Sequence, residues 1–130
     1  MSVLLLAVLL VPEGSAAGPE EEIVHLLQYI EQSECVFTRN GKEHLGPEAL
    51  EHIQMKYDYV RKKVETTEDF IRYAATKSSL SGRPYLVRCD EVELPTAEWL
   101  KAELARFRQP ESEPAPPDEK SSPRGVQPME

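Results

Sequence analysis

The sequence predicts a helix-dominated α+β fold, with about four helices and two short β-hairpins that form one small antiparallel sheet. Three observations favour this fold class. Apolar residues recur at intervals of three and four in several segments, which is typical of amphipathic helices. Two pairs of short strand-like stretches lie between these segments, each pair joined by a turn dipeptide. Cys35 and Cys89 fall in different pairs, so a bond between them would place the two hairpins side by side.

Residues 1–17 have the pattern of a secretory signal peptide. The apolar run from Val3 to Val11 is too short to span a bilayer, which needs about 20 apolar residues, and four small residues follow it as a cleavage site. The run lacks the preceding Lys or Arg that signal peptides usually carry. We expect the protein to be exported to the periplasm and its mature form to start at Ala17 or Gly18.

Residues 109–130 predict a disordered acidic tail. This segment holds more than half of the chain's 11 prolines together with several carboxylates, and it has no aromatic residue. Such a composition buries too little apolar area to offset the entropy of ordering the chain. The sequence therefore leaves residues 18–108 as a single folded domain.

The net charge of the chain at pH 7 is −8, which argues against nucleic acid or anionic lipid as a partner, since both need a cationic surface. In an exported chain the lone pair Cys35 and Cys89 predicts a disulfide, which would stabilise the fold by about 4 kcal/mol. The two cysteines and three scattered histidines show no metal-ligand spacing. We therefore expect no metal and no other cofactor.

The first helix is predicted from Pro19 to near Ser33. A proline at its first position and three glutamates after it suit the positive end of a helix, and the apolar stripe of this helix would face the core. The stripe consists of Ile23, Leu26, Leu27 and Ile30. A hairpin follows, because Asn40-Gly41 separates residues 35–39 from residues 42–45. Its second arm is polar, which predicts an edge strand.

The longest helix should begin at Gly46 and carry a stripe that ends near Val64, before residues 65–67 break it. Thr66 and Asp69 resemble a capping box for a third helix, whose buried face would run from Phe70 to Ala75. A serine-rich loop at residues 77–84 leads into the second hairpin, made of residues 85–89 and 92–94. Thr96 is predicted to cap the last helix, whose apolar residues are Trp99, Leu100, Leu104 and Phe107.

Several short motifs, kept at fixed spacing, together resemble a known family. They are Cys35-x-Phe37-x-Arg39-Asn40-Gly41, Glu48-Ala49-x-x-His52 with Lys56-Tyr57, Glu68-Asp69-Phe70-Ile71, Ser78-Ser79-x-Ser81-Gly82-x-Pro84-Tyr85 with Cys89, and Trp99-Leu100. The family consists of small exported bacterial proteins of unknown function and includes the enterobacterial protein YfeK. The resemblance covers nearly the whole predicted domain. It implies a single exported domain with a cysteine pair and no established activity.

The polar members of these motifs form the candidate binding site. His52 and Lys56 lie one helical turn apart, and they would meet a turn and a loop rich in hydrogen-bond donors. The candidate residues are Arg39, Asn40, His52, Lys56, Ser78, Ser79, Ser81 and Tyr85. Such a site would suit a small anion or a peptide carboxylate. The alternative interpretation is a solvated helix face without a ligand.

The leading hypothesis is therefore a non-enzymatic binding or interaction module, monomeric or weakly self-associating, whose partner is a periplasmic protein, a peptide or a small anion. Two alternatives remain. Ser81-Gly82-x-x-Tyr85 is similar to a motif of bacterial periplasmic lysozyme inhibitors, although those proteins are β-rich. A small cell-envelope hydrolase could pair one of the loop serines with His52, but no nucleophile motif flanks these serines.

Overall fold

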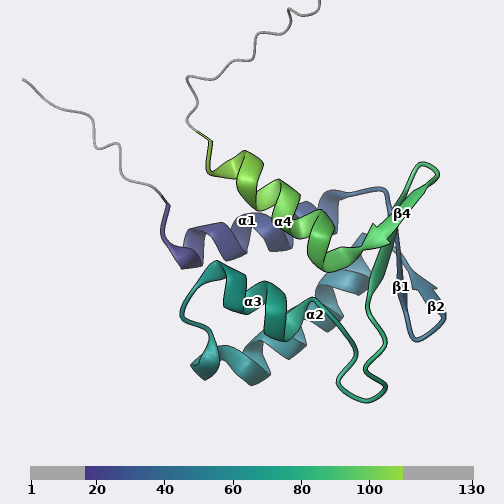
Figure 1. Ribbon diagram of the computed structural model, residues 1–130, viewed down its shortest axis with the longest axis horizontal. Helices are drawn as coiled ribbons and strands as arrows, with labels where there is room; N and C mark the ends of the chain where they lie inside the picture. The colour runs from purple at the N-terminus through teal and green to yellow at the C-terminus, as the bar shows by residue number, and fades with distance from the viewer. Residues whose placement is uncertain (1–16, 110–130) are drawn as a thin grey trace, which may run out of the picture.

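The computed structural model describes residues 17–109. The predicted signal peptide, apart from Ala17, and the predicted tail from residue 110 onward lie outside this part of the chain. Within it the elements follow the predicted order of helix, hairpin, two helices, hairpin and helix (Figure 1). They are α1 (Pro19–Gln32), β1 (Val36–Arg39), β2 (Lys42–His44), α2 (Gly46–Val60), η1 (Arg61–Lys63), α3 (Thr67–Ala74), β3 (Leu86–Cys89), β4 (Val92–Pro95) and α4 (Thr96–Phe107). The helix-dominated α+β fold is thus confirmed.

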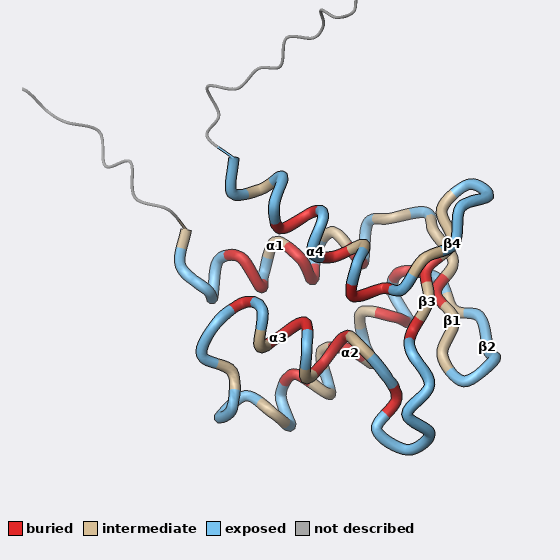
Figure 2. Tube along the Cα trace, in the orientation of Figure 1, coloured by how far each residue is buried: buried red, intermediate tan, exposed pale blue. Residues whose placement is uncertain are grey.

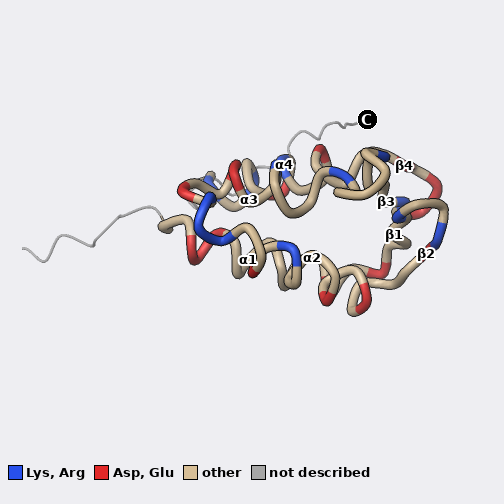
Figure 3. The backbone as a smooth tube through the Cα atoms, turned by 90° about the horizontal axis from the view of Figure 1, so that it is seen from below, with Lys and Arg blue, Asp and Glu red and all other residues tan. Residues whose placement is uncertain are grey.

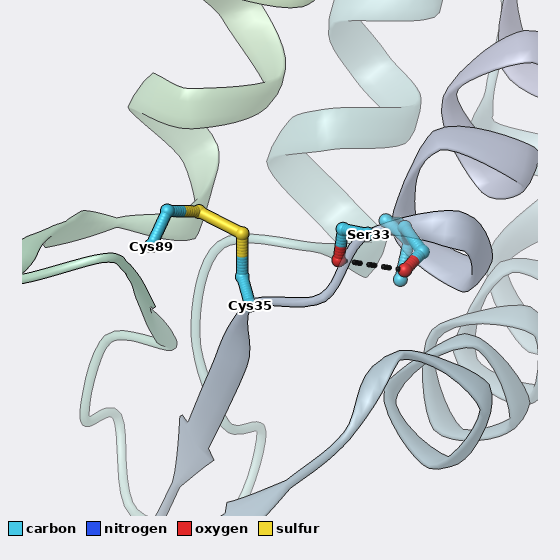
Figure 4. The surroundings of a disulfide bond; sticks show 4 residues. Ser33, Cys35 and Cys89 are labelled. Atoms are coloured by element: carbon cyan, nitrogen blue, oxygen red, sulfur yellow. Dashed lines mark hydrogen bonds between the residues drawn. A yellow bond between two sulfur atoms is a disulfide. The ribbon is translucent and has the colours of Figure 1, made fainter.

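The two hairpins join into one antiparallel sheet of order β2-β1-β3-β4. The central pair is β1 with β3, in which Phe37 lies opposite Val87. Cys35 and Cys89 form a disulfide at the end of this pair, as predicted, with their Cα atoms 4.5 Å apart (Figure 4). The polar strand β2 lies at the edge of the sheet, where charged residues protect a strand from pairing with other chains.

The helices pack against one another beside the sheet, which occupies one end of the molecule (Figure 1). Their buried residues lie on the faces that turn toward each other (Figure 2). The predicted stripe of α1 is buried as a whole, and Phe70, Ile71, Ala74 and Ala75 supply the buried part of the third helical segment. Helix α2 contacts β1, and α4 contacts β3 and β4, so both helices reach the sheet.

Local chemistry fixes the positions of the turns. The backbone of Asn40 and Gly41 is left-handed, with φ of 53° and 80°, as an Asn-Gly hairpin turn requires. The capping box at α3 is present, since the Thr66 side chain accepts from the Asp69 backbone and the Asp69 side chain accepts from the Thr66 backbone. Gly46 allows the start of α2 to approach the end of α1, because a Cβ there would lie 2.6 Å from the carbonyl oxygen of Ile30.

Three sequence expectations need correction at element ends. Helix α2 ends at Val60 and continues as the single 3-10 turn η1, so Val64 lies beyond the helix. Tyr85 precedes β3 rather than belonging to it. Thr96 is not the N-cap of α4: Pro95 occupies that position, and the Thr96 backbone N–H donates to the carbonyl of Tyr85. That bond holds Thr96 at the first position of the helix, with its side chain in the interior.

A buried carboxylate connects three helices at the end of the molecule away from the sheet. Glu22 of α1 is only 5% exposed, yet it accepts hydrogen bonds from Thr67 of α3 and from Arg108 after α4. Arg108 also bonds to Glu68. Hydrogen bonding to Arg108 lowers the pKa of Glu22 despite the opposing effect of burial. This network fixes the C-terminal end of α4 against α1 and α3.

Charged residues of both signs are distributed over the helices, and η1 carries the basic run Arg61–Lys63 between α2 and α3 (Figure 3). Among residues 17–109 no helix is long and apolar enough to cross a membrane.

Candidate functional site

Three of the predicted site residues form a hydrogen-bonded chain between α2 and the start of β3. The Lys56 ammonium donates to the hydroxyl of Tyr85, at 3.1 Å, and to the carbonyl of Lys77, at 2.7 Å. The Tyr85 hydroxyl lies 3.1 Å from Nε2 of His52. Because an ammonium can only donate, the Tyr85 oxygen accepts from Lys56. The tautomer of His52 sets which atom donates in the bond between Nε2 and the Tyr85 hydroxyl.

The electrostatics of this chain follow from burial and from an excess of positive charge. Burial, followed by the charges of Arg39 and Lys56, lowers the pKa of His52 to about 4. Burial also lowers the pKa of Lys56 and raises the pKa of Tyr85. His52 is therefore neutral at pH 7, although it lies in a positively charged environment.

A small pocket opens beside His52, where the sheet meets α2 and the first turn of α4. Its volume is about 20 Å³, which is enough for a group the size of one water molecule. The lining residues are Phe37, Thr38, Arg39, His44, Glu48, Ala49, His52, Ile53, Tyr85 and Thr96. Arg39 of β1 forms no ion pair with any carboxylate in residues 17–109. Within this part of the chain, a ligand would therefore displace no carboxylate from its guanidinium.

Two buried polar atoms in the wall of this pocket have no hydrogen-bond partner in the described part of the chain. They are Oγ1 of Thr96 and Nε2 of His44. Thr96 is completely buried, and Nδ1 of His44 lies 3.3 Å from a carboxylate oxygen of Glu48. A buried polar atom without a partner costs about 1–3 kcal/mol, so native proteins rarely leave one unsatisfied. Both residues that carry these atoms line the pocket.

The serine-rich loop is closed onto the first hairpin by its own side chains. Ser78 Oγ accepts from the Asn40 side chain and from the backbone of Leu80 and Ser81, while the Ser81 hydroxyl donates to Asn40. Ser78 is buried. Asn40, Ser78 and Ser81 are therefore engaged in holding the loop. Ser79 lies elsewhere, at the groove that Met55 and Tyr59 line on α2.

The structure thus divides the predicted site residues into groups. Arg39, His52 and Tyr85 line the pocket, and Lys56 joins them through Tyr85. Sequence reasoning missed Thr96 and His44 as pocket residues. In the sequence, Thr96 has the position of an ordinary helix N-cap, and His44 is an isolated histidine in a polar edge strand. Neither residue therefore belongs to a pattern that indicates binding. No cluster of His, Cys, Asp or Glu within residues 17–109 could hold a metal ion.

The geometry bears on both alternative functions. Tyr85 is 5% exposed and bonded to His52 and Lys56, so its ring is not presented on the surface as an inhibitor loop would require. Nε2 of His52 bonds to Tyr85, whereas the hydroxyls of Ser78 and Ser81 bond to Asn40. None of the hydrogen bonds in residues 17–109 joins a serine to His52.

Residues 17–108 match a family described as a family of unknown function, DUF5329. The chain belongs to this family. The matched range coincides with the folded domain that the sequence predicts, and it contains every residue of the pocket. Because the family has no assigned activity, its function has to be argued from the site.

Among curated proteins, the chain is similar to the uncharacterized protein YfeK of Salmonella typhimurium, with 36% identity over 70 residues. The match covers 53% of this chain and 58% of that protein, so the chain spans somewhat more than half the length of its relative. The expected resemblance to a YfeK-like family of unknown function is confirmed. No solved structure matches the chain.

Proposed function

We propose that this protein is a periplasmic, non-enzymatic binding module that holds a carboxylate group of its ligand in the pocket beside Arg39. The observation that carries the proposal is an arginine without an ion-pair partner among residues 17–109, placed next to buried polar atoms that lack hydrogen bonds. A guanidinium forms paired hydrogen bonds with a carboxylate, which makes arginine the residue best suited to such a ligand.

The electrostatic environment supports an anionic ligand. Arg39 and Lys56 are both close enough to His52 to lower its pKa, although the chain as a whole has a net charge of −8. Glu48 is the single acidic residue in the pocket lining, and its side chain is 67% exposed. A positive potential confined to one pocket of an acidic protein favours anions at that place.

The size of the pocket limits how the ligand binds. A volume of about 20 Å³ admits one oxygen of a carboxylate but not a whole amino acid or sugar. The ligand would therefore insert an end group, and the rest of it would remain outside. The C-terminus of a peptide and a small organic acid both offer such a group. Comparing the binding of a dipeptide with that of acetate distinguishes the two kinds of ligand.

Titration of the folded protein with acetyl-Ala-Ala tests the proposal. The free acid should shift the amide NMR signals of β1 and of the start of α4, whereas the C-terminal amide of the same dipeptide should not. Acetate serves as the small-acid probe: if acetate binds as well as the dipeptide, the ligand is a small organic acid rather than a peptide end. Arg39→Gln should abolish binding, while Lys101→Gln, an exposed cation on α4, should leave it unchanged.

Equal binding of the acid and the amide would contradict the carboxylate assignment, as would full binding by the Arg39→Gln variant. Export is tested separately, by the intact mass of the protein recovered from the periplasm of a bacterial host. A mass that begins at Ala17 or Gly18 supports export, and a cytoplasmic protein that retains residues 1–16 overturns it.

A further inference from the structure

A second, larger concavity lies on the same side of α2, toward its C-terminal end. It is an open groove of about 440 Å³ between α2, α3 and the serine-rich loop. The groove is lined by Met55, Lys56, Tyr59, Val60, Lys63, Tyr73 and Ser79. None of these residues lines the Arg39 pocket, although Lys56 lies between the two through its bond to Tyr85. We call this concavity the α2–α3 groove.

Large apolar side chains are exposed in the α2–α3 groove. Tyr59 is 90% exposed and Met55 is 61% exposed, whereas Ile53 and Tyr57 of the same helix are buried in the core. The fold therefore does not use Tyr59 or Met55 for its own packing. Tyrosine and methionine are enriched at protein interfaces, and methionine adapts to varied partners.

The charges at the groove are all positive. Its charged lining residues are Lys56 and Lys63, and neither forms an ion pair with a carboxylate in residues 17–109. The Lys63 ammonium lies 5.2 Å from the centre of the Tyr73 ring, and the Arg72 guanidinium lies 4.9 Å from it. Three cations thus surround an aromatic groove on a protein with a net charge of −8.

We infer that the α2–α3 groove is a docking surface for an acidic peptide segment that carries an apolar or aromatic side chain. Carboxylates of the segment would pair with Lys56 and Lys63, and its apolar side chain would lie against Tyr59 and Met55. Such charge complementarity gives an interface its register and speeds its association. The inference does not rest on Arg39, although Lys56 contributes to the positive charge at both places.

A second copy of this chain fits the groove less well than an acidic peptide. In a symmetric dimer the same surface of each copy faces the other, so the lysines of one groove would oppose those of its partner. Like charges placed in this way destabilise an interface. Self-association is nevertheless an outcome that the experiment records.

The test uses a fluorescein-labelled peptide, acetyl-Glu-Glu-Phe-Glu-Glu-Leu amide, at low ionic strength with fluorescence anisotropy as the readout. Its blocked C-terminus removes the carboxylate that the Arg39 pocket would bind. Lys63→Glu and Tyr59→Ser should each weaken binding about tenfold or more. Lys101→Glu and Val92→Ser are the matched controls, since they alter an exposed cation and an exposed apolar residue elsewhere, and they should leave the affinity unchanged.

Two peptide variants and one change of ionic strength separate the contributions to binding. Replacing every glutamate with glutamine, or both apolar residues with serine, should abolish binding, and added salt should weaken the parent complex. Arg39→Gln should bind the peptide normally, which distinguishes this groove from the proposed pocket. The inference is overturned if the parent peptide fails to bind, or if Lys63→Glu and Tyr59→Ser bind it normally. Self-association and binding to anionic vesicles are measured for the same variants. The inference is also overturned if Lys63→Glu and Tyr59→Ser change only these two properties and not the affinity for the peptide.

Discussion

Nε2 of His52 lies 3.1 Å from the hydroxyl of Tyr85, and the two rings meet edge to face. The pair joins the middle of α2 to the residue that precedes β3. Lys56 donates to the same hydroxyl, so one buried tyrosine, which also lines the Arg39 pocket, binds two polar side chains of α2.

The first prediction concerns the titration of His52. Its pKa in the folded protein is about 4, because of burial and then of the Arg39 charge, against about 6.5 in the unfolded chain. Between these values the unfolded state binds a proton and the folded state does not, so stability should fall as the pH drops from about 6.5 to about 4. NMR titration of the imidazole measures this pKa.

Arg39→Met should raise the pKa of His52, since it removes a nearby positive charge, and Lys101→Met should leave it unchanged. A bound carboxylate should raise it as well. A His52 that titrates near 6.5 in the free protein would show that the ring is solvated.

A second prediction concerns the Glu22 network. Arg108→Ala leaves the buried Glu22 without its main partner and should lower the free energy of unfolding by about 1–3 kcal/mol. Lys101→Ala removes a cation from an exposed pair with Glu98 and should cost at most about 0.5 kcal/mol. Urea denaturation measures both. Equal losses for the two variants would mean that burial of Glu22 does not matter.

The serine loop gives a matched pair of neighbours for a third prediction. Ser78 is buried and accepts three hydrogen bonds, whereas Ser79 is exposed. Ser78→Ala should destabilise the protein by about 1–3 kcal/mol, because its donors lose their acceptor. Ser79→Ala should change stability by no more than about 0.5 kcal/mol. Thermal denaturation compares them, and a loss confined to Ser79→Ala would contradict the loop geometry.

Gly46 provides the fourth prediction. A methyl group at this position would lie 2.6 Å from the carbonyl oxygen of Ile30, which is backbone and cannot rotate away. Gly46→Ala should therefore destabilise the fold by about 1–3 kcal/mol, despite the higher helix propensity of alanine. Gly18→Ala is the control, since no atom lies within 4 Å of a Cβ built there. Calorimetry of both variants measures the difference, and a stabilised Gly46→Ala protein would rule out the close contact.

The sequence predicted the features that depend on local patterns. The stripe of α1, the Asn40-Gly41 turn and the capping box of Thr66 each involve residues a few positions apart, so their chemistry is visible in the chain. The disulfide followed from there being only two cysteines, Cys35 and Cys89, in a chain expected to be exported.

The pocket could be predicted only in part. Arg39, His52 and Tyr85 were candidates because they belong to recurring motifs, but their meeting with Thr96 results from tertiary packing. Thr96 is a residue type that often caps helices, but the hydrogen bond from its backbone to Tyr85 holds it in the interior. No local sequence pattern predicts such a bond. The α2–α3 groove was missed for a similar reason, since Tyr73 reaches it from another helix.

The pairing of β1 with β3 has a consequence for how the chain is made. Synthesis proceeds from the N-terminus, so β1 is complete long before Leu86–Cys89 exists to cover its inner edge. A nascent or truncated chain that stops after α3 would expose that edge, along with the apolar face that α4 covers. Such fragments should aggregate rather than fold, and the Arg39 pocket cannot form until Thr96 has been added.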